Sequence, residues 1–148
     1  PVVERLLQAN VPVNQPIQDG MSPLMLAAAL GDAVIVDRLL ASGADPTRQD
    51  RFGNTALHAV ALLGWDAYEA EPAKSLIGVL ADRGCPVNAR NEDGQNPLLL
   101  LLGARAQAGQ PVPNKQLLPL LDALLARGAD LDCQDQRGVS VLHAAAMH

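Results

Sequence analysis

Histidines, carboxylates and cysteines are the residues of this chain whose types and spacing could do chemistry. His58 and His143 lie in two similar segments, Thr55-Ala-Leu-His58 and Ser140-Val-Leu-His143. A histidine that recurs at one position of a repeated segment is expected to serve the scaffold and not a reaction. No serine or cysteine has a base at the spacing of a nucleophile motif, and there is no glycine-rich phosphate loop. We therefore predict that the chain is not an enzyme and has no catalytic residues, no cofactor and no small-molecule substrate.

One carboxylate segment, Asp130-x-Asp132-x-Gln134, begins like a calcium-binding loop. A calcium loop of this kind requires a glycine where Asp135 stands and a bidentate glutamate where Val141 stands. Asp45 and Asp130 each follow Gly-Ala, and aspartate at such a position favours a turn. The sequence therefore predicts turns at these carboxylates and no metal site.

Cys85 and Cys133 are the two cysteines. They are too few and too far apart for a disulfide framework or a C-x-x-C metal site, and we expect both to be small, semi-buried fillers. Two free thiols weakly favour a reducing, cytoplasmic-type compartment; the cellular location is otherwise unknown.

Composition narrows the class of protein further. The chain has 148 residues, a net charge of −5 and 49% apolar residues, but only three aromatics, Phe52, Trp65 and Tyr68. Its length suits a single domain whose core is made of leucine, alanine and valine, a mixture that favours helices. Few aromatics and a negative charge argue against a nucleic-acid partner. The longest apolar run, 97–104, is far shorter than the roughly 18 residues of a bilayer span, so we expect no membrane insertion.

The elements that must position these residues recur along the chain. Gly20, Gly53, Gly94 and Gly138 begin four similar segments, 33, 41 and 44 residues apart. Two residues after each glycine stands a serine, threonine or asparagine that can cap a helix, followed by a short run rich in leucine and alanine. Each unit is therefore expected to open with a capped helix.

A second series of apolar positions follows in each unit. Residues 35–43, 76–84 and 120–128 carry apolar side chains at i, i+1, i+4 and i+5 and then a glycine. This spacing predicts one stripe of a helix, ended by a glycine in the left-handed conformation. We predict that Leu39, Leu40, Leu124 and Leu125 face the interior between stacked units.

The segments Gly53-Asn-Thr-Ala-Leu-His-Ala-Val-Ala and Leu39-Leu-Ala-Ser-Gly-Ala-Asp closely resemble the ankyrin repeat. The resemblance spans nearly the whole chain and implies an all-α fold with short β-hairpin fingers, an ankyrin-type α-solenoid of stacked helix-turn-helix repeats. In this family the histidine at the position of His58 ties the hairpin to the start of the helix; Met25 and Leu99 occupy the equivalent positions of two other units. Independently, a single Leu/Ala helix pair cannot bury its own stripe, which also argues for stacking.

We interpret the chain as one domain, 1–148, within a longer parent chain. The expected units are a partial repeat with an outer helix only (1–16), repeat 1 (17–49), repeat 2 (50–90) with an insert at about 65–72, repeat 3 (91–134) with an insert at about 105–115, and a truncated repeat with an inner helix only (135–148). Pro119 predicts that the outer helix of repeat 3 either begins late or bends.

The resemblance implies a non-catalytic protein-interaction module that binds a partner on the concave face formed by fingers and inner helices. The alternative is a regulatory or structural arm of a larger enzyme or membrane protein that docks on its own chain. The partner is thus a protein of unknown identity or another segment of the parent chain.

Three groups of residues are candidates for partner binding, each with a structural alternative. The polar fingertips could contact a partner, or Phe52 could pack on the neighbouring finger. Leucines near the ends of the inner helices could align in an exposed apolar strip, or could complete the core. Two aromatics of the first insert could anchor a partner, or could cover the gap between the inserts. In this order the groups are Arg51, Phe52, Glu92, Asp93 and Arg137; Leu30, Leu62, Leu63 and Met147; Trp65 and Tyr68.

Overall fold

The computed structural model describes residues 8–62, 70–106 and 114–146, and the structural statements below concern these residues. They contain one short 3₁₀ helix and seven α-helices. In chain order these are η1 (Gln18–Gly20), α2 (Pro23–Leu30), α3 (Ala33–Ala41), α4 (Ala56–Leu62), α5 (Ala70–Asp82), α6 (Pro97–Ala106), α7 (Asn114–Leu125) and α8 (Val141–Ala145).

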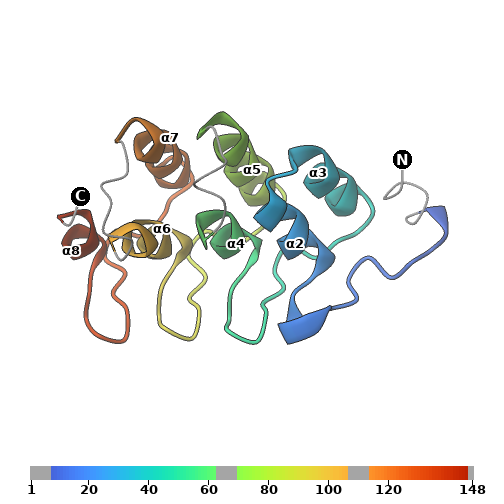
Figure 1. Ribbon diagram of the computed structural model, residues 1–148, viewed down its shortest axis with the longest axis horizontal. Coiled ribbons are helices and arrows are strands. Elements are labelled where there is room, and N and C mark those ends of the chain that lie inside the picture. The colour runs from blue at the N-terminus through green and yellow to red at the C-terminus, as the bar shows by residue number, and fades with distance from the viewer. Residues whose placement is uncertain (1–7, 63–69, 107–113, 147–148) are drawn as a thin grey trace.

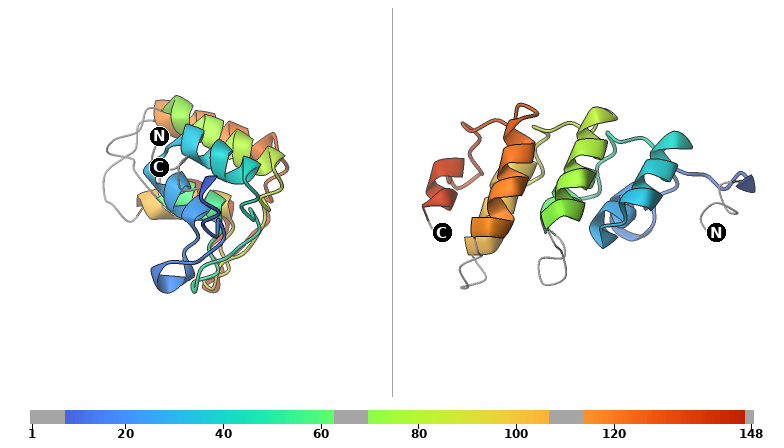
Figure 2. Two further views of the ribbon diagram at one scale, coloured as in Figure 1. Left: turned by 90° about the vertical axis from the view of Figure 1, so that its right-hand side faces the viewer. Right: turned by 90° about the horizontal axis from the view of Figure 1, so that it is seen from above.

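The helices form two layers that run along the molecule (Figure 1). The inner helices α2, α4, α6 and α8 pack in sequence, and the outer helices α3, α5 and α7 pack in a second row. Hairpins project from the inner layer, so that the molecule is L-shaped when it is viewed along the stack (Figure 2). This arrangement confirms the predicted all-α solenoid.

The inner helices begin where the sequence predicts them. Ser22 Oγ accepts a hydrogen bond from the Met25 N–H at 3.2 Å, and Asn96 Oδ1 accepts one from the Leu99 N–H at 2.8 Å. These side chains satisfy amides of the first turn, which have no partner within the helix. The caps therefore set the first residues of α2 and α6.

Four hairpins, which we call fingers 1 to 4, comprise residues 17–21, 50–54, 91–95 and 135–139. In each finger the first residue donates its N–H to the carbonyl of the fifth, at 2.8–3.0 Å. The predicted hairpin fingers are present as tight turns, and in the described residues the bridge between Gln134 and Ser140 is isolated. Each finger is too short for a ladder, because its tight turn occupies almost all of its length.

Successive fingers are joined through their backbones. The N–H groups of Arg51, Glu92 and Gln136 each donate to a carbonyl of the preceding finger, at 2.8–2.9 Å. At Gly53, whose φ is +76°, a Cβ would lie 3.0 Å from the Cα of Asn91. Glycine is needed there both for the backbone conformation and for the close approach of finger 3.

The core lies between the layers and contains the predicted leucines, with one exception. Leu39, Leu40 and Leu124 are buried, but Leu125 is 36% exposed, so its predicted burial is wrong. The equivalent Leu40 belongs to α3, which packs against the next outer helix, α5. Within the described chain α7 has no outer helix beyond it, which leaves the far side of Leu125 in solvent.

The expected inserts differ from the structure at their edges. Helix α5 already begins at Ala70 and takes in residues 70–72, while α6 extends to Ala106 and α7 begins at Asn114. Pro119 lies inside α7, so this helix does not begin late. Pro119 is the sixth residue of α7, beyond the first four positions whose N–H groups have no partner within the helix, so it removes one hydrogen bond of the helix interior. The rest of both inserts and the first seven residues lie outside the described part of the chain.

Candidate functional site

His58 links two neighbouring repeats. Its Nδ1 accepts from the N–H of Thr55 at 3.1 Å, and its Nε2 lies 2.9 Å from the carbonyl oxygen of Gln95 in finger 3. Because Nδ1 accepts a hydrogen bond, the ring is neutral and carries its proton on Nε2, which donates to the Gln95 carbonyl. Burial lowers the pKa of His58 and outweighs the opposite effects of Gln95 and Asp50. The geometry is that of a scaffold histidine, as the sequence predicts.

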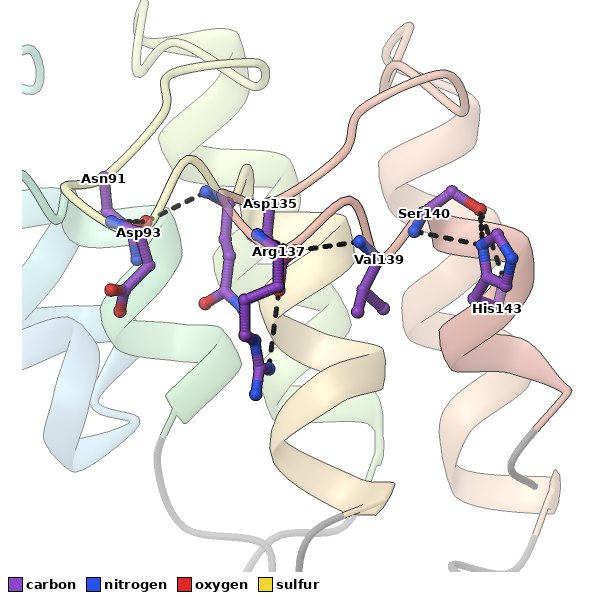
Figure 3. A network of polar contacts seen from close by, with 8 residues as sticks. Asn91, Asp93, Asp135, Arg137, Val139, Ser140 and His143 are labelled. Atoms are coloured by element: carbon purple, nitrogen blue, oxygen red, sulfur yellow. Dashed lines mark hydrogen bonds and ion pairs between the residues drawn. The ribbon is translucent and has the colours of Figure 1, made fainter.

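His143 occupies the same position in the last unit, but its ring is exposed. Its Nδ1 lies 2.7 Å from Ser140 Oγ, and the Ser140 Oγ accepts from the His143 N–H (Figure 3). The two residues form a reciprocal cap at the start of α8. This histidine therefore has a structural contact of its own.

The other side chains that could take part in chemistry have structural roles in the described residues. Cys85 and Cys133 are free and buried, and burial raises the pKa of the Cys85 thiol, which keeps it protonated and unreactive. Asp130 Oδ1 accepts from the Asp132 N–H at 2.9 Å, as a turn-forming aspartate does. No group of histidine, cysteine and carboxylate side chains in the described chain could hold a metal ion. In the same residues, no helix has both the length and the apolarity needed to cross a bilayer.

Finger 2 presents the predicted arginine and aromatic pair. Phe52 is 45% exposed, and the Arg51 guanidinium lies over its ring, 4.5 Å from the centroid. Arg51 also forms an ion pair of 2.7 Å with Asp19 of finger 1. The guanidinium thus covers one face of the ring, the rest of the half-exposed ring stays open at the fingertip, and the positive charge is paired with Asp19.

Fingers 3 and 4 carry the other predicted fingertip residues (Figure 3). Glu92 and Asp93 are exposed, and neither carboxylate forms an ion pair within the described chain. Arg137 is paired with Asp135 at 3.5 Å, and the Gln136 side chain donates to the Glu92 carbonyl. Finger 3 is therefore the acidic point of the fingertip row.

Asp135, the first residue of finger 4, is buried and stays ionised. Burial opposes its ionisation, but hydrogen bonds from the N–H groups of Val139 and Arg137 and the charge of Arg137 outweigh it and hold the pKa of Asp135 below its ordinary value. The carboxylate accepts from these two N–H groups at 2.8 and 2.9 Å. The turn of finger 4 is thereby held rigid.

A hollow of about 570 Å³, which we call the finger groove, lies between fingers 3 and 4 and the inner helices. Leu62, at the end of α4, is 47% exposed and lines it. Within the described residues, Leu62 thus lies at the surface of this hollow. The other lining residues are Asp93, Gln95, Leu100, Gly103, Asp135, Gln136 and Arg137.

A second apolar hollow, of about 430 Å³, lies at the N-terminal end of the stack, and Leu30 lines it. Leu30 is 66% exposed, so within the described residues it also lies at the surface. Leu30 and Leu62 thus line different hollows, and the described residues do not form the single predicted strip. The reason is register: Ala29, not Leu30, is the equivalent of Leu62, and consecutive residues of a helix point about 100° apart. Leu63, Trp65, Tyr68 and Met147 lie outside the described residues.

Two asparagines to which the sequence pattern assigned no role hold the ends of outer helices. Asn88 donates to the Gly128 carbonyl at 2.9 Å and accepts from the Asp130 N–H at 2.7 Å. Asn14 makes the same pair of bonds to Gly43 and Asp45, at 3.1 and 2.8 Å. Their signal in the sequence is an asparagine three residues before fingers 1 and 3.

Thr47 stands where Asn14 and Asn88 stand in their own units. The residue that it would hold is Pro86, which has no N–H to donate. Thr47 instead donates through its N–H and its hydroxyl to Asp45 Oδ1, at 2.9 and 2.7 Å. The repeats are therefore joined by different polar contacts at different steps of the stack.

Comparison with known proteins agrees with the geometry. The family of ankyrin repeats (3 copies) matches residues 1–70 and again 24–108. The chain belongs to the ankyrin repeat family, and ankyrin repeats are generally protein-protein interaction modules of a non-catalytic fold.

Relatives include three much longer proteins. The chain is 30% identical over 146 residues to the phosphocholine transferase AnkX of Legionella pneumophila and 31% identical over 157 residues to the E3 ubiquitin-protein ligase KEG of Arabidopsis thaliana. It is 41% identical over 81 residues to human neurogenic locus notch homolog protein 4. These alignments cover 97%, 98% and 55% of the chain but only 14%, 8% and 4% of the relatives. The similarity is therefore to the repeat portion of each.

Proposed function

We propose that this chain is a non-catalytic binding module that holds a segment of another protein on its concave face. The observation that carries the proposal is the exposure of Leu62 in a hollow bounded by two fingers. Isolated apolar side chains on a surface are normal, but one set in a concave site with polar groups around it is typical of a binding site.

The fingertips supply the polar edge of this surface. Arg51 and Phe52 of finger 2 are of residue types enriched at interfaces, and Glu92 and Asp93 of finger 3 and Arg137 of finger 4 add charged side chains along the row. The backbone hydrogen bonds between fingers hold these side chains in a fixed row. A partner therefore meets a preformed surface, which lowers the entropic cost of binding.

An alternative is that the segment held on this face belongs to the parent chain itself. The relatives in which these repeats are a small fraction of a long protein favour this alternative. In that case the module is a regulatory or structural arm, and its groove is filled before any other protein arrives.

The test uses fragments of the source organism's proteome displayed on phage and selected on the purified chain. We expect enriched fragments to lose binding to Leu62→Glu and to Phe52→Ala, and to keep binding to Asp122→Lys, a control on the outer helix α7. Leu62→Glu is expected to keep the melting temperature of the wild type within a few degrees, because the leucine is half exposed, whereas the buried Leu57→Glu unfolds the chain. Enriched fragments that bind all three variants equally would contradict the proposal.

The alternative is tested with a longer protein in which the repeats keep their flanking parent sequence. If a segment of the parent chain occupies the concave face, this longer protein fails to bind the fragments that the isolated module enriches. Equal binding by the longer protein and by the isolated module leaves the face free for another protein.

A further inference from the structure

Gly103 is a glycine in the interior of helix α6 for which the described residues show no packing or backbone reason. Its φ is not in the left-handed region, and a Cβ built on it would meet a single atom within 4 Å, the Gln95 side-chain nitrogen at 3.9 Å. A glycine in a helix interior is less favourable than alanine by about 1 kcal/mol. The helix therefore carries a residue that weakens it, although a side chain would fit.

The other glycine inside an α-helix of the described chain has a packing reason. At Gly78 a Cβ would lie 3.0 Å from an Nη atom of Arg127, so that glycine admits the guanidinium. At Gly103 no group of the described residues takes the place of the missing side chain. What its missing side chain leaves open is the finger groove, between Leu62 of α4 and finger 4.

The charges beside this groove are unbalanced. Of the charged fingertip residues, Asp19 is paired with Arg51, and Asp135 with Arg137. Glu92 and Asp93 have no ion pair within the described residues, and Asp93 lines the groove. The groove thus combines an apolar floor at Leu62 and Leu100 with an excess of negative charge at one edge.

We infer that the finger groove takes a short linear segment of a partner that inserts an aliphatic side chain beside Gly103 and places a lysine or arginine next to Asp93. The inference rests on the proposed function and specifies the partner of the same surface. The volume, about 570 Å³, is in the usual range of ligand pockets. The aliphatic side chain covers Leu62 and Leu100, and the basic group pairs with the free carboxylates.

The probes are peptides enriched from a random 12-residue phage library on the wild-type chain, synthesised and measured by fluorescence anisotropy. We expect them to contain an aliphatic residue within four positions of a lysine or arginine. Changing that basic residue of the peptide to glutamate is expected to weaken binding about tenfold at low salt and less at high salt. Asp93→Asn is expected to reduce the difference between the two peptides, and Asp122→Lys to leave it unchanged.

Two substitutions at Gly103 separate binding from folding. Gly103→Ala and Gly103→Leu add the missing side chain, so we expect an equal or higher melting temperature for Gly103→Ala and, for Gly103→Leu, at least a tenfold loss of peptide affinity. Gly103→Ala is expected to lose less affinity than Gly103→Leu. If Gly103→Leu fails to fold, the peptide affinity of Gly103→Ala tests the inference instead. An affinity of Gly103→Ala equal to that of the wild type would overturn the inference.

Three further results would overturn the inference. The enriched peptides could lack basic residues, they could bind every Gly103 variant as tightly as the wild type, or the library could yield no binder. None of these results contradicts the proposed function if proteome fragments still require Leu62 and Phe52. Fragments that ignore those two residues contradict the proposed function itself.

Discussion

The imidazole of His58 donates through Nε2 to the carbonyl oxygen of Gln95, 2.9 Å away, and so joins the helix start of one repeat to the finger of the next. The same carbonyl accepts the N–H of Asn91 at 3.0 Å, which closes finger 3. A buried side chain thus holds a hairpin whose other face belongs to the proposed binding surface. The rigidity of that surface follows from contacts made in the core.

The first prediction concerns removal of this contact. His58→Leu is expected to lower the free energy of unfolding at pH 7.5 by about 1–3 kcal/mol, because the buried groups of Thr55 and Gln95 lose their partner. Leucine fits the site sterically, since Leu99 occupies the equivalent position of the next repeat. Urea unfolding measures the loss, and equal stability of variant and wild type would show that the contact is not needed.

The second prediction follows from the lowered pKa of His58. Below its unfolded value of about 6.5, the unfolded chain binds the proton more readily than the folded chain does, so protonation favours unfolding. The contribution of neutral His58 is present in full above that pH and is lost as the pH falls toward the folded pKa. The gap in stability between wild type and His58→Leu should therefore narrow between pH 7.5 and pH 5. A gap that is constant or grows as the pH falls would refute the assignment of this pH dependence to His58.

The third prediction concerns the asparagine clamps. Asn88→Ala removes two hydrogen bonds at the end of the outer helix α7 and should cost about 1 kcal/mol of unfolding free energy. Thr47→Ala is the matched control, because Thr47 holds the equivalent position but bonds only within its own turn. Its expected cost is a few tenths of a kcal/mol. Chemical denaturation of both variants measures the two losses of unfolding free energy. A larger loss for Thr47→Ala than for Asn88→Ala would contradict the prediction.

Local features of the fold could be predicted from the sequence. The capping roles of Ser22 and Asn96 follow from residue type and position alone, because a cap satisfies amides only two or three residues away. The scaffold role of His58 follows from its recurrence at His143. Such features depend on neighbours along the chain, which a single sequence displays directly.

Features that depend on stacking could not be predicted in the same way. Leu125 has the sequence pattern of Leu40, but its exposure is decided by the absence of an outer helix beyond α7 in the described chain. Leu30 and Leu62 are both leucines at helix ends, yet a shift of one position in the repeat places them in different hollows. The sequence therefore predicts which residues lie at the fingertips, but not which leucines lie together in one hollow beneath them.

The fourth prediction uses two adjacent leucines to test the position of the core. Leu124 is 2% exposed and Leu125 is 36% exposed, although they are consecutive in α7. Leu124→Ala should lower the free energy of unfolding by about 2–5 kcal/mol, through lost burial and a new cavity. Leu125→Ala should cost clearly less, because much of its side chain already contacts water. Thermal unfolding of the two variants measures the difference, and equal losses would place the outer helix in another orientation.

The fifth prediction compares two glycines that have the same conformation and different surroundings. Gly53 and Gly138 have φ values of +76° and +78°, so alanine at either position pays the cost of the left-handed conformation, about 1 kcal/mol. At Gly53 the new Cβ would also lie 3.0 Å from the Cα of Asn91 and 3.1 Å from the nitrogen of Glu92, and would push finger 3 away from finger 2. At Gly138 it would meet nothing within 4 Å. Gly53→Ala should therefore destabilise the chain by at least about 1 kcal/mol more than Gly138→Ala. Urea unfolding of both variants measures the two losses of stability. Equal losses would contradict the close approach of fingers 2 and 3, which the 2.8 Å hydrogen bond from the Glu92 N–H to the Phe52 carbonyl requires.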